Sequence, residues 1–103
     1  MELGETAAKA AQLVGGDRHE LYGDPFDDYT RTVRLFELLT GIGLTVEQAV
    51  IFMQCVKMSR AANAFTPDNM VDLCGYSDIR NYVHQRQLER DSQICSPSSN
   101  SPT

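Results

Sequence analysis

Two short motifs, each a helix-capping residue followed by proline, constrain this chain more than any other feature. In Asp24-Pro25 and Thr66-Pro67 the first side chain can accept a backbone N–H at a helix start. Proline suits the first helical position because its missing N–H needs no partner there. Thr45 opens a third start, a Thr-Val-Glu-Gln capping box. The three motifs therefore predict where three helices begin.

Apolar residues recur at helical spacing after each of these starts, and no stretch of useful length alternates with period two. Helices are predicted over about residues 2–14, 25–40, 45–60 and 67–90. One predicted inward stripe comprises Phe26, Tyr29, Val33, Phe36 and Thr40. The sequence therefore predicts an all-α fold, a compact bundle of about four helices.

Two segments are predicted to lie outside the helices. Gly15 and Gly16 are expected to stop the first helix and to open a loop that reaches Pro25. From Ser92 onward the chain has low hydrophobicity and two prolines, which is typical of a disordered tail. The predicted organisation is a helical domain over residues 1–91 and a disordered C-terminal tail over residues 92–103.

Size and charge exclude several classes of protein. A chain of 103 residues buries only a modest core, which favours a homo-oligomer. A net charge of −5 argues against binding a DNA or RNA duplex, because phosphate backbones need a dense basic field. No apolar run is long enough to span a membrane. The sequence has no CxxC pair, the usual sign of a zinc site. We expect a cytoplasmic protein with reduced thiols.

Four charged residues form the first candidate site. Lys57 and Arg60 are neighbours on one predicted helix, and Asp68 and Asp72 lie one turn apart on the next. A short turn joins the two helices, so both pairs are expected near the same end of the bundle. One interpretation is a buried ion pair with structural value only. The other is a phosphate held by the basic pair, with an aspartate binding Mg²⁺ or a base edge.

The predicted loop supplies the second candidate site. Gly23, with the capping residues that follow it, is explained by a turn and a helix start. Arg18, His19 and Tyr22 are not explained in that way. A cation, an imidazole and an aromatic ring can together stack on a base and contact a phosphate. Tyr76, next to a mid-helix glycine, is a further candidate for stacking, although close helix packing also accounts for that glycine.

These motifs together resemble a family of small phage and prophage proteins of unassigned function. The resemblance covers about residues 12–83 and comprises Gly-Asp-Arg…Tyr-Gly-Asp-Pro from residue 16, Lys-x-x-Arg from residue 57, and Asp-x-x-x-Asp-x-x-Gly-Tyr from residue 68. That family is distantly similar to the MazG-like, all-α nucleoside triphosphate pyrophosphohydrolases. Those enzymes are helical oligomers that hold Mg²⁺ with acidic pairs on two successive helices.

The resemblance implies that Asp68 and Asp72 stand for the second acidic pair. Where the first pair is expected, the chain has Lys57 and Arg60, which repel Mg²⁺. The main hypothesis is therefore a phage-type homo-oligomer that binds a nucleotide or cyclic nucleotide, as a protein that sequesters a host defence signal would. The alternatives are a Mg²⁺-dependent nucleoside triphosphate pyrophosphohydrolase and an interaction module without a small ligand.

In the nucleotide hypothesis each candidate residue has a stated role. Arg18, Lys57 and Arg60 contact phosphate, and Asp72 orients the cationic pair or reads a base edge. Tyr22 or Tyr76 stacks on the base. No cofactor is required, but Mg²⁺ bound by Asp68 and Asp72 belongs to the enzyme alternative.

Overall fold

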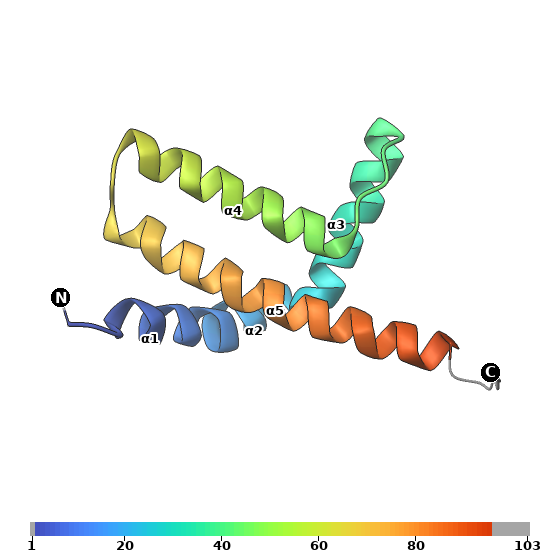
Figure 1. The fold of residues 1–103 in the computed structure, drawn as a ribbon, viewed down its shortest axis with the longest axis horizontal. Helices are drawn as coiled ribbons and strands as arrows, with labels where there is room; N and C mark the ends of the chain where they lie inside the picture. The colour runs from blue at the N-terminus through green and yellow to red at the C-terminus, as the bar shows by residue number, and fades with distance from the viewer. Residues whose placement is uncertain (1, 96–103) are drawn as a thin grey trace.

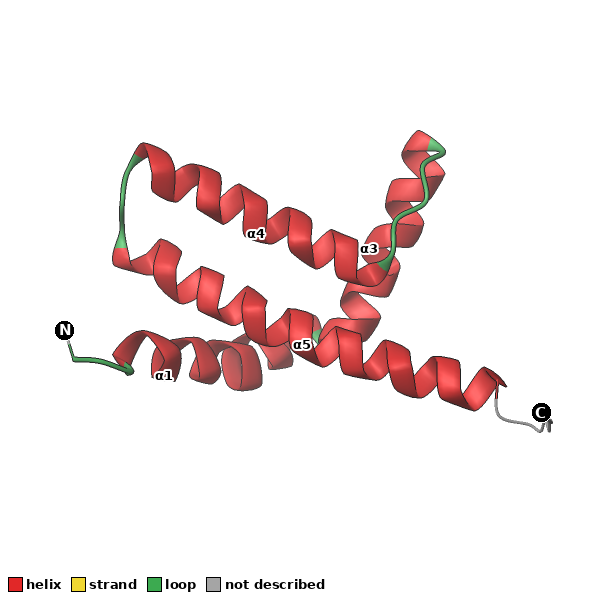
Figure 2. Cartoon of the chain, viewed as in Figure 1, coloured by secondary structure: helices red, strands yellow, loops and turns green. Residues whose placement is uncertain are grey.

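The computed structural model describes the backbone of residues 2–95, and their side chains except those of residues 17, 18, 94 and 95. Within this range the chain is helical, with short connections and no strand (Figures 1 and 2). The elements are α1 (Glu5–Gln12), the π-helical turn η1 (Leu13–Asp17), α2 (Arg18–Tyr22), α3 (Pro25–Thr40), α4 (Val46–Asn63) and α5 (Pro67–Cys95). The predicted all-α class, with four main helices, is confirmed.

The three predicted helix starts are confirmed by their capping hydrogen bonds. At α3 the Asp27 N–H donates to Asp24 Oδ2 at 3.2 Å. At α4 the capping box is complete, with Thr45 Oγ1 and Gln48 Oε1 each accepting the other residue's N–H. At α5 the Thr66 hydroxyl oxygen accepts an N–H at 3.2 Å. Each cap satisfies a donor that the first helical turn leaves unpaired.

The predicted loop over residues 15–25 is wrong for most of its length. Gly15 and Gly16 lie inside η1, and the chain stays helical to Tyr22. The packing of η1 against α5 explains why: a Cβ on Gly75 would lie 3.2 Å from Val14 Cγ2. This close contact holds the turn in place, and a single wide π turn redirects the helix without ending it.

The core lies where α4 and α5 run antiparallel and α3 crosses their junction (Figure 1). A short turn at residues 64–66 joins α4 to α5, and α1 packs against the other side of α5. The central buried cluster comprises Phe26, Val50, Tyr76, Ile79 and Val83, with Val14, Tyr29, Val46 and Met53 packed against it. Every main helix except α1 contributes to this cluster, so it sets their relative positions.

The C-terminal half of α5 extends beyond this core (Figure 1). The helix continues past the predicted end near Arg90, and past the predicted boundary at residue 91, to Cys95. Gln87 and Asp91, one turn apart, form a 2.8 Å hydrogen bond that supports this polar stretch. The rest of the predicted tail, residues 96–103, lies outside the described residues. No helix in the described range is long and apolar enough to cross a membrane.

Candidate functional site

A pocket of about 280 Å³ lies between α2, the start of α3 and the middle of α5. Its walls combine three tyrosine rings and an imidazole with aliphatic side chains and one carboxylate. The lining residues are Val14, His19, Tyr22, Gly23, Pro25, Asp28, Tyr29, Tyr76 and Ile79. A mostly apolar, aromatic hollow with a few polar groups is typical of a site for a small organic molecule.

The local sequence explains how these side chains converge. Gly23 ends α2 with φ of +81°, a left-handed conformation that glycine adopts without steric cost, and its N–H donates to the His19 carbonyl at 2.8 Å. Asp24 and Pro25 then start α3 at once in a new direction. This sharp junction brings the rings of α2 and α3 to the same hollow. The contact of Val14 with Gly75 brings η1 close to Tyr76.

Arg31 connects α2 and α3 beside the pocket. Its guanidinium lies 3.7 Å from the Asp28 carboxylate and makes a weak 3.5 Å hydrogen bond to the Tyr22 carbonyl. Both ends of this bridge belong to residues that line the pocket. Since the Arg31 side chain is mostly exposed, its guanidinium can exchange these contacts for an anion without losing core packing.

Asp24 holds α5 to the rim of the pocket. The Tyr82 hydroxyl donates a hydrogen bond to Asp24 Oδ1, and the Asp27 N–H donates to the other oxygen. Partial burial raises the pKa of Asp24, but these hydrogen bonds and nearby Arg86 outweigh it, so the pKa lies below its ordinary value. The same bond to Asp24, aided by burial, raises the pKa of the Tyr82 hydroxyl.

The predicted charged constellation is only partly assembled. Lys57 Nζ lies 2.7 Å from Asp72 Oδ2, and their side chains are 16% and 17% exposed. Arg60 and Asp68 are exposed near the α4–α5 turn, and neither lines the aromatic pocket. Of the two interpretations of this constellation, the geometry of the Lys57–Asp72 pair fits the structural ion pair.

The remaining predicted residues divide between two neighbouring hollows. Tyr22 and Tyr76, predicted separately as stacking residues, line the same pocket. Asp72 lines a much smaller hollow that shares Tyr76 with it. Arg18 begins α2, but its side chain lies outside the described part of the chain. The structure therefore brings the aromatic candidates together and separates them from Lys57.

Asp68 and Asp72 are the residues predicted to hold Mg²⁺ in the enzyme alternative. They lie one turn apart on α5, but an ammonium group already lies at hydrogen-bonding distance from Asp72. In the described part of the chain no three His, Cys, Asp or Glu side chains are grouped closely enough to hold a metal ion.

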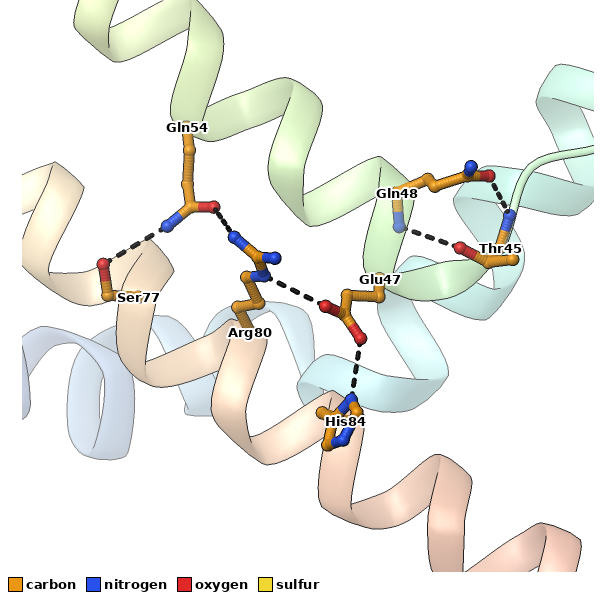
Figure 3. A network of polar contacts seen from close by, with 7 residues as sticks. All are labelled: Thr45, Glu47, Gln48, Gln54, Ser77, Arg80 and His84. Carbon is orange, nitrogen blue, oxygen red and sulfur yellow. Dashed lines mark hydrogen bonds and ion pairs between the residues drawn. The ribbon is translucent and has the colours of Figure 1, made fainter.

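A polar network between α4 and α5 was not predicted (Figure 3). Glu47 accepts a hydrogen bond from Arg80 Nε at 3.1 Å, and its other oxygen lies 2.8 Å from His84 Nδ1. The contact with His84 and then that with Arg80 lower the pKa of Glu47. Arg80 also donates to Gln54, which in turn donates to Ser77. The spacing of Arg80 and His84, one turn apart on α5, is the signal that could have indicated this network.

The fold and pocket define a small all-α protein with an aromatic hollow of ligand size. A family model described as a domain of unknown function, DUF6378, matches residues 5–84. The chain belongs to this family. No curated protein and no solved structure matches it.

Proposed function

We propose that this protein binds a nucleotide or a nucleotide-derived signal, with the base in the aromatic pocket. The observation that carries the proposal is the convergence of Tyr22, Tyr29 and Tyr76 on one hollow of about 280 Å³. A base stacked on an aromatic side chain gains roughly 1–3 kcal/mol per base, and the planar faces accept any base. A hollow of this volume suits one base with part of its sugar.

Polar groups at the pocket suit the edges of a base. The Asp28 carboxylate accepts hydrogen bonds only, so it matches an exocyclic amine or a ring N–H. The His19 imidazole offers a donor or an acceptor, depending on its tautomer. Such groups give orientation and selectivity, while the tyrosine rings supply most of the contact area.

Arg31 is the main proposed contact for the phosphate of the ligand. Arg31 already lies at two lining residues and is mostly exposed, whereas Lys57 is engaged with Asp72. A planar guanidinium can give phosphate two parallel hydrogen bonds. Arg18, at the start of α2, stays a predicted second phosphate contact. Arg60 stays a predicted contact only for a ligand long enough to reach the α4–α5 turn.

We favour binding over hydrolysis because a Mg²⁺ ion at Asp72 would have to displace the Lys57 ammonium group at 2.7 Å. We further propose that the protein is of phage origin and distantly related to the MazG-like enzymes. In it the protein acts as a homo-oligomer in the cytoplasm, that of the host cell if a phage encodes it.

The test is a thermal-shift screen of nucleotides and cyclic nucleotides, with and without Mg²⁺. A ligand at 100 times its dissociation constant adds about 2.7 kcal/mol, which raises the melting temperature of a domain this small by on the order of 10 °C. We expect one nucleotide class to give this shift. Tyr22→Ala should weaken its binding on the order of tenfold or more, since stacking is lost.

Leu21→Ala is the matched control, because Leu21 precedes Tyr22 on α2 and is exposed but does not line the pocket. Its affinity should equal that of the wild type. Equal losses in the two variants would refute the pocket as the site, and no shift with any nucleotide would refute the function. Release of pyrophosphate in the stabilised sample would favour the enzyme alternative instead.

A further inference from the structure

The end of α3 and the residues after it form a projecting segment, residues 34–43, which we call the α3 arm (Figure 1). Every residue of this arm is exposed. The predicted inward stripe of α3 therefore ends at Val33, because Phe36 and Thr40 lie beyond the core. Leu38 and Leu39 are 80% and 82% exposed, an unusual environment for two adjacent leucines.

The exposed apolar residues of the arm follow a helical pattern. Leu35, Leu38 and Leu39 are spaced i, i+3 and i+4, which places them on one stripe of α3. The exposed Ile42 follows after Gly41, whose φ of +77° ends the helix. A stripe of this kind normally faces another helix. With Phe36, these side chains expose on the order of 500 Å² of apolar surface, which is within the roughly 300–600 Å² of the largest patch on a typical monomer, a patch that is often functional.

A groove lies between the start of α4, which follows the arm in sequence, and residues 83–91 of α5. Its volume is about 560 Å³. Apolar side chains supply much of its lining, namely Leu44, Val46, Val83 and Leu88. The arm and the C-terminal half of α5 project from the same end of the molecule, with the start of α4 between them (Figure 1). One end of the molecule thus carries both an apolar projection and a hollow, whose lining also includes the polar residues Thr45, Glu47, His84, Gln87 and Asp91.

We propose that a second copy of this chain covers this end, with the two α3 arms packed against each other and toward the groove of the opposite copy. Under two-fold symmetry the arm of each chain packs against the other chain, so a single interface covers the arm and the groove of both chains. Arm and groove together approach the roughly 800 Å² per partner of a standard stable interface.

Charge and shape both favour a second copy as the occupant. The chain carries a net charge of −5, but the arm holds one cation, Arg34, and one anion, Glu37, so two arms do not repel each other. The radius of gyration is 16.4 Å, against about 13 Å for an isolated domain of this length. The arm and the end of α5 both project from the helical core, as expected of an elongated molecule (Figure 1).

The test compares the association of the wild type with that of Leu38→Gln/Leu39→Gln by sedimentation velocity over a range of concentrations. We expect the wild type to have twice the 11.5 kDa mass of one chain. The double variant should raise the dimer dissociation constant at least 100-fold. Met58→Gln is the matched control, since Met58 lies on α4 with the same 58% exposure as Leu35, and it should leave association unchanged.

Hydrogen exchange of the wild type supplies a measurement that does not depend on a variant folding. Amides of residues 35–45 should exchange at least tenfold more slowly in the dimeric than in the diluted sample. A wild type that stays monomeric at high concentration, or a double variant that associates as the wild type does, would overturn the proposal. The dimer proposal does not depend on the proposed nucleotide site, because none of the arm residues lines the aromatic pocket. Nucleotide affinity measured on the double variant therefore tests the ligand site separately.

Discussion

Two charged clusters join α4 to α5, and they differ in burial. Near the α4–α5 turn, Lys57 and Asp72 form one short contact with both side chains largely removed from water. At the opposite end, Glu47 contacts Arg80 and His84 with side chains one third to one half exposed. The chemistry is alike and the helix pair is the same, so burial decides what each cluster contributes.

The difference arises from what lies on the far side of α5. Residues of α1 and η1, including Ala10 and Leu13, lie with Asp72 around one small hollow, which limits access of water to the carboxylate. In the single chain, Glu47 and His84 instead border the groove at the other end, where water has access to them. A partly buried charge needs its partner far more than an exposed one does, because water no longer substitutes for that partner.

The largest effect is expected from Lys57→Ala. Removal of the ammonium group leaves the Asp72 carboxylate partly buried without its 2.7 Å cation, and the free energy of unfolding should fall by about 2–3 kcal/mol. Urea denaturation of the wild type and the variant measures this loss. Arg80→Ala is the comparison from the exposed cluster and should cost under about 1 kcal/mol.

Lys57→Met combined with Asp72→Leu sharpens the same comparison. Replacing both charges by apolar side chains also removes the carboxylate that Lys57→Ala deprives of its ammonium partner, so stability should recover most of what Lys57→Ala loses. Equal losses from Lys57→Ala and Arg80→Ala would show that burial does not separate the clusters.

An intermediate effect is expected from Tyr82→Phe, which removes the hydrogen bond to Asp24. The loss should be about 1 kcal/mol near neutral pH, since the bond is charge-assisted but partly exposed. The Asp24 pKa is lowered from 3.8 and the Tyr82 pKa is raised from 10.0. The contact therefore stabilises the fold between these two values and is lost as pH falls below the first or rises above the second.

Stability of the wild type and of Tyr82→Phe, followed from pH 3 to pH 11 in urea, measures this dependence. The difference between the two should be greatest near neutrality and should shrink at both extremes. A difference that stays constant with pH would mean that the hydroxyl contributes by some route other than its hydrogen bond to the Asp24 carboxylate.

The smallest effect is expected from Glu47→Gln in the exposed cluster. Because the folded-state pKa of Glu47 lies below its ordinary 4.5, its carboxylate adds stability above that pH and loses it as pH falls through the lowered value. Thermal melts should therefore show a small deficit at pH 7 that disappears toward pH 3. Added salt should diminish the deficit as well, while the Lys57–Asp72 contact should be less sensitive to salt.

The elements of the fold that could be predicted are those encoded by local signals. Asp24, Thr45 and Thr66 act within one helical turn, so their capping roles can be read from the sequence. Two stacking candidates, Tyr22 and Tyr76, also proved to share a pocket. Tyr22 was selected because a turn and a helix cap did not explain it, and Tyr76 because it follows a mid-helix glycine; Tyr76 also belongs to the buried core cluster.

The features that could not be predicted depend on contacts between distant segments. Two adjacent glycines favour a helix end locally, whereas in the fold η1 packs against α5 through Val14 and Gly75 and stays helical. Tyr82 meets Asp24, and Glu47 meets His84, across tens of residues that no spacing rule connects. Lys57 and Asp72 were predicted to lie close, but burial, which favours the structural interpretation, is a property of the assembled helices.

The placement of the tyrosines gives this protein an optical consequence. The chain has four tyrosines and no tryptophan, and three of the tyrosines line the pocket. Its ultraviolet emission therefore originates mostly from the residues that a bound base would touch. A base stacked on these rings would quench that emission, so the unlabelled protein can report by fluorescence how much of its pocket is filled.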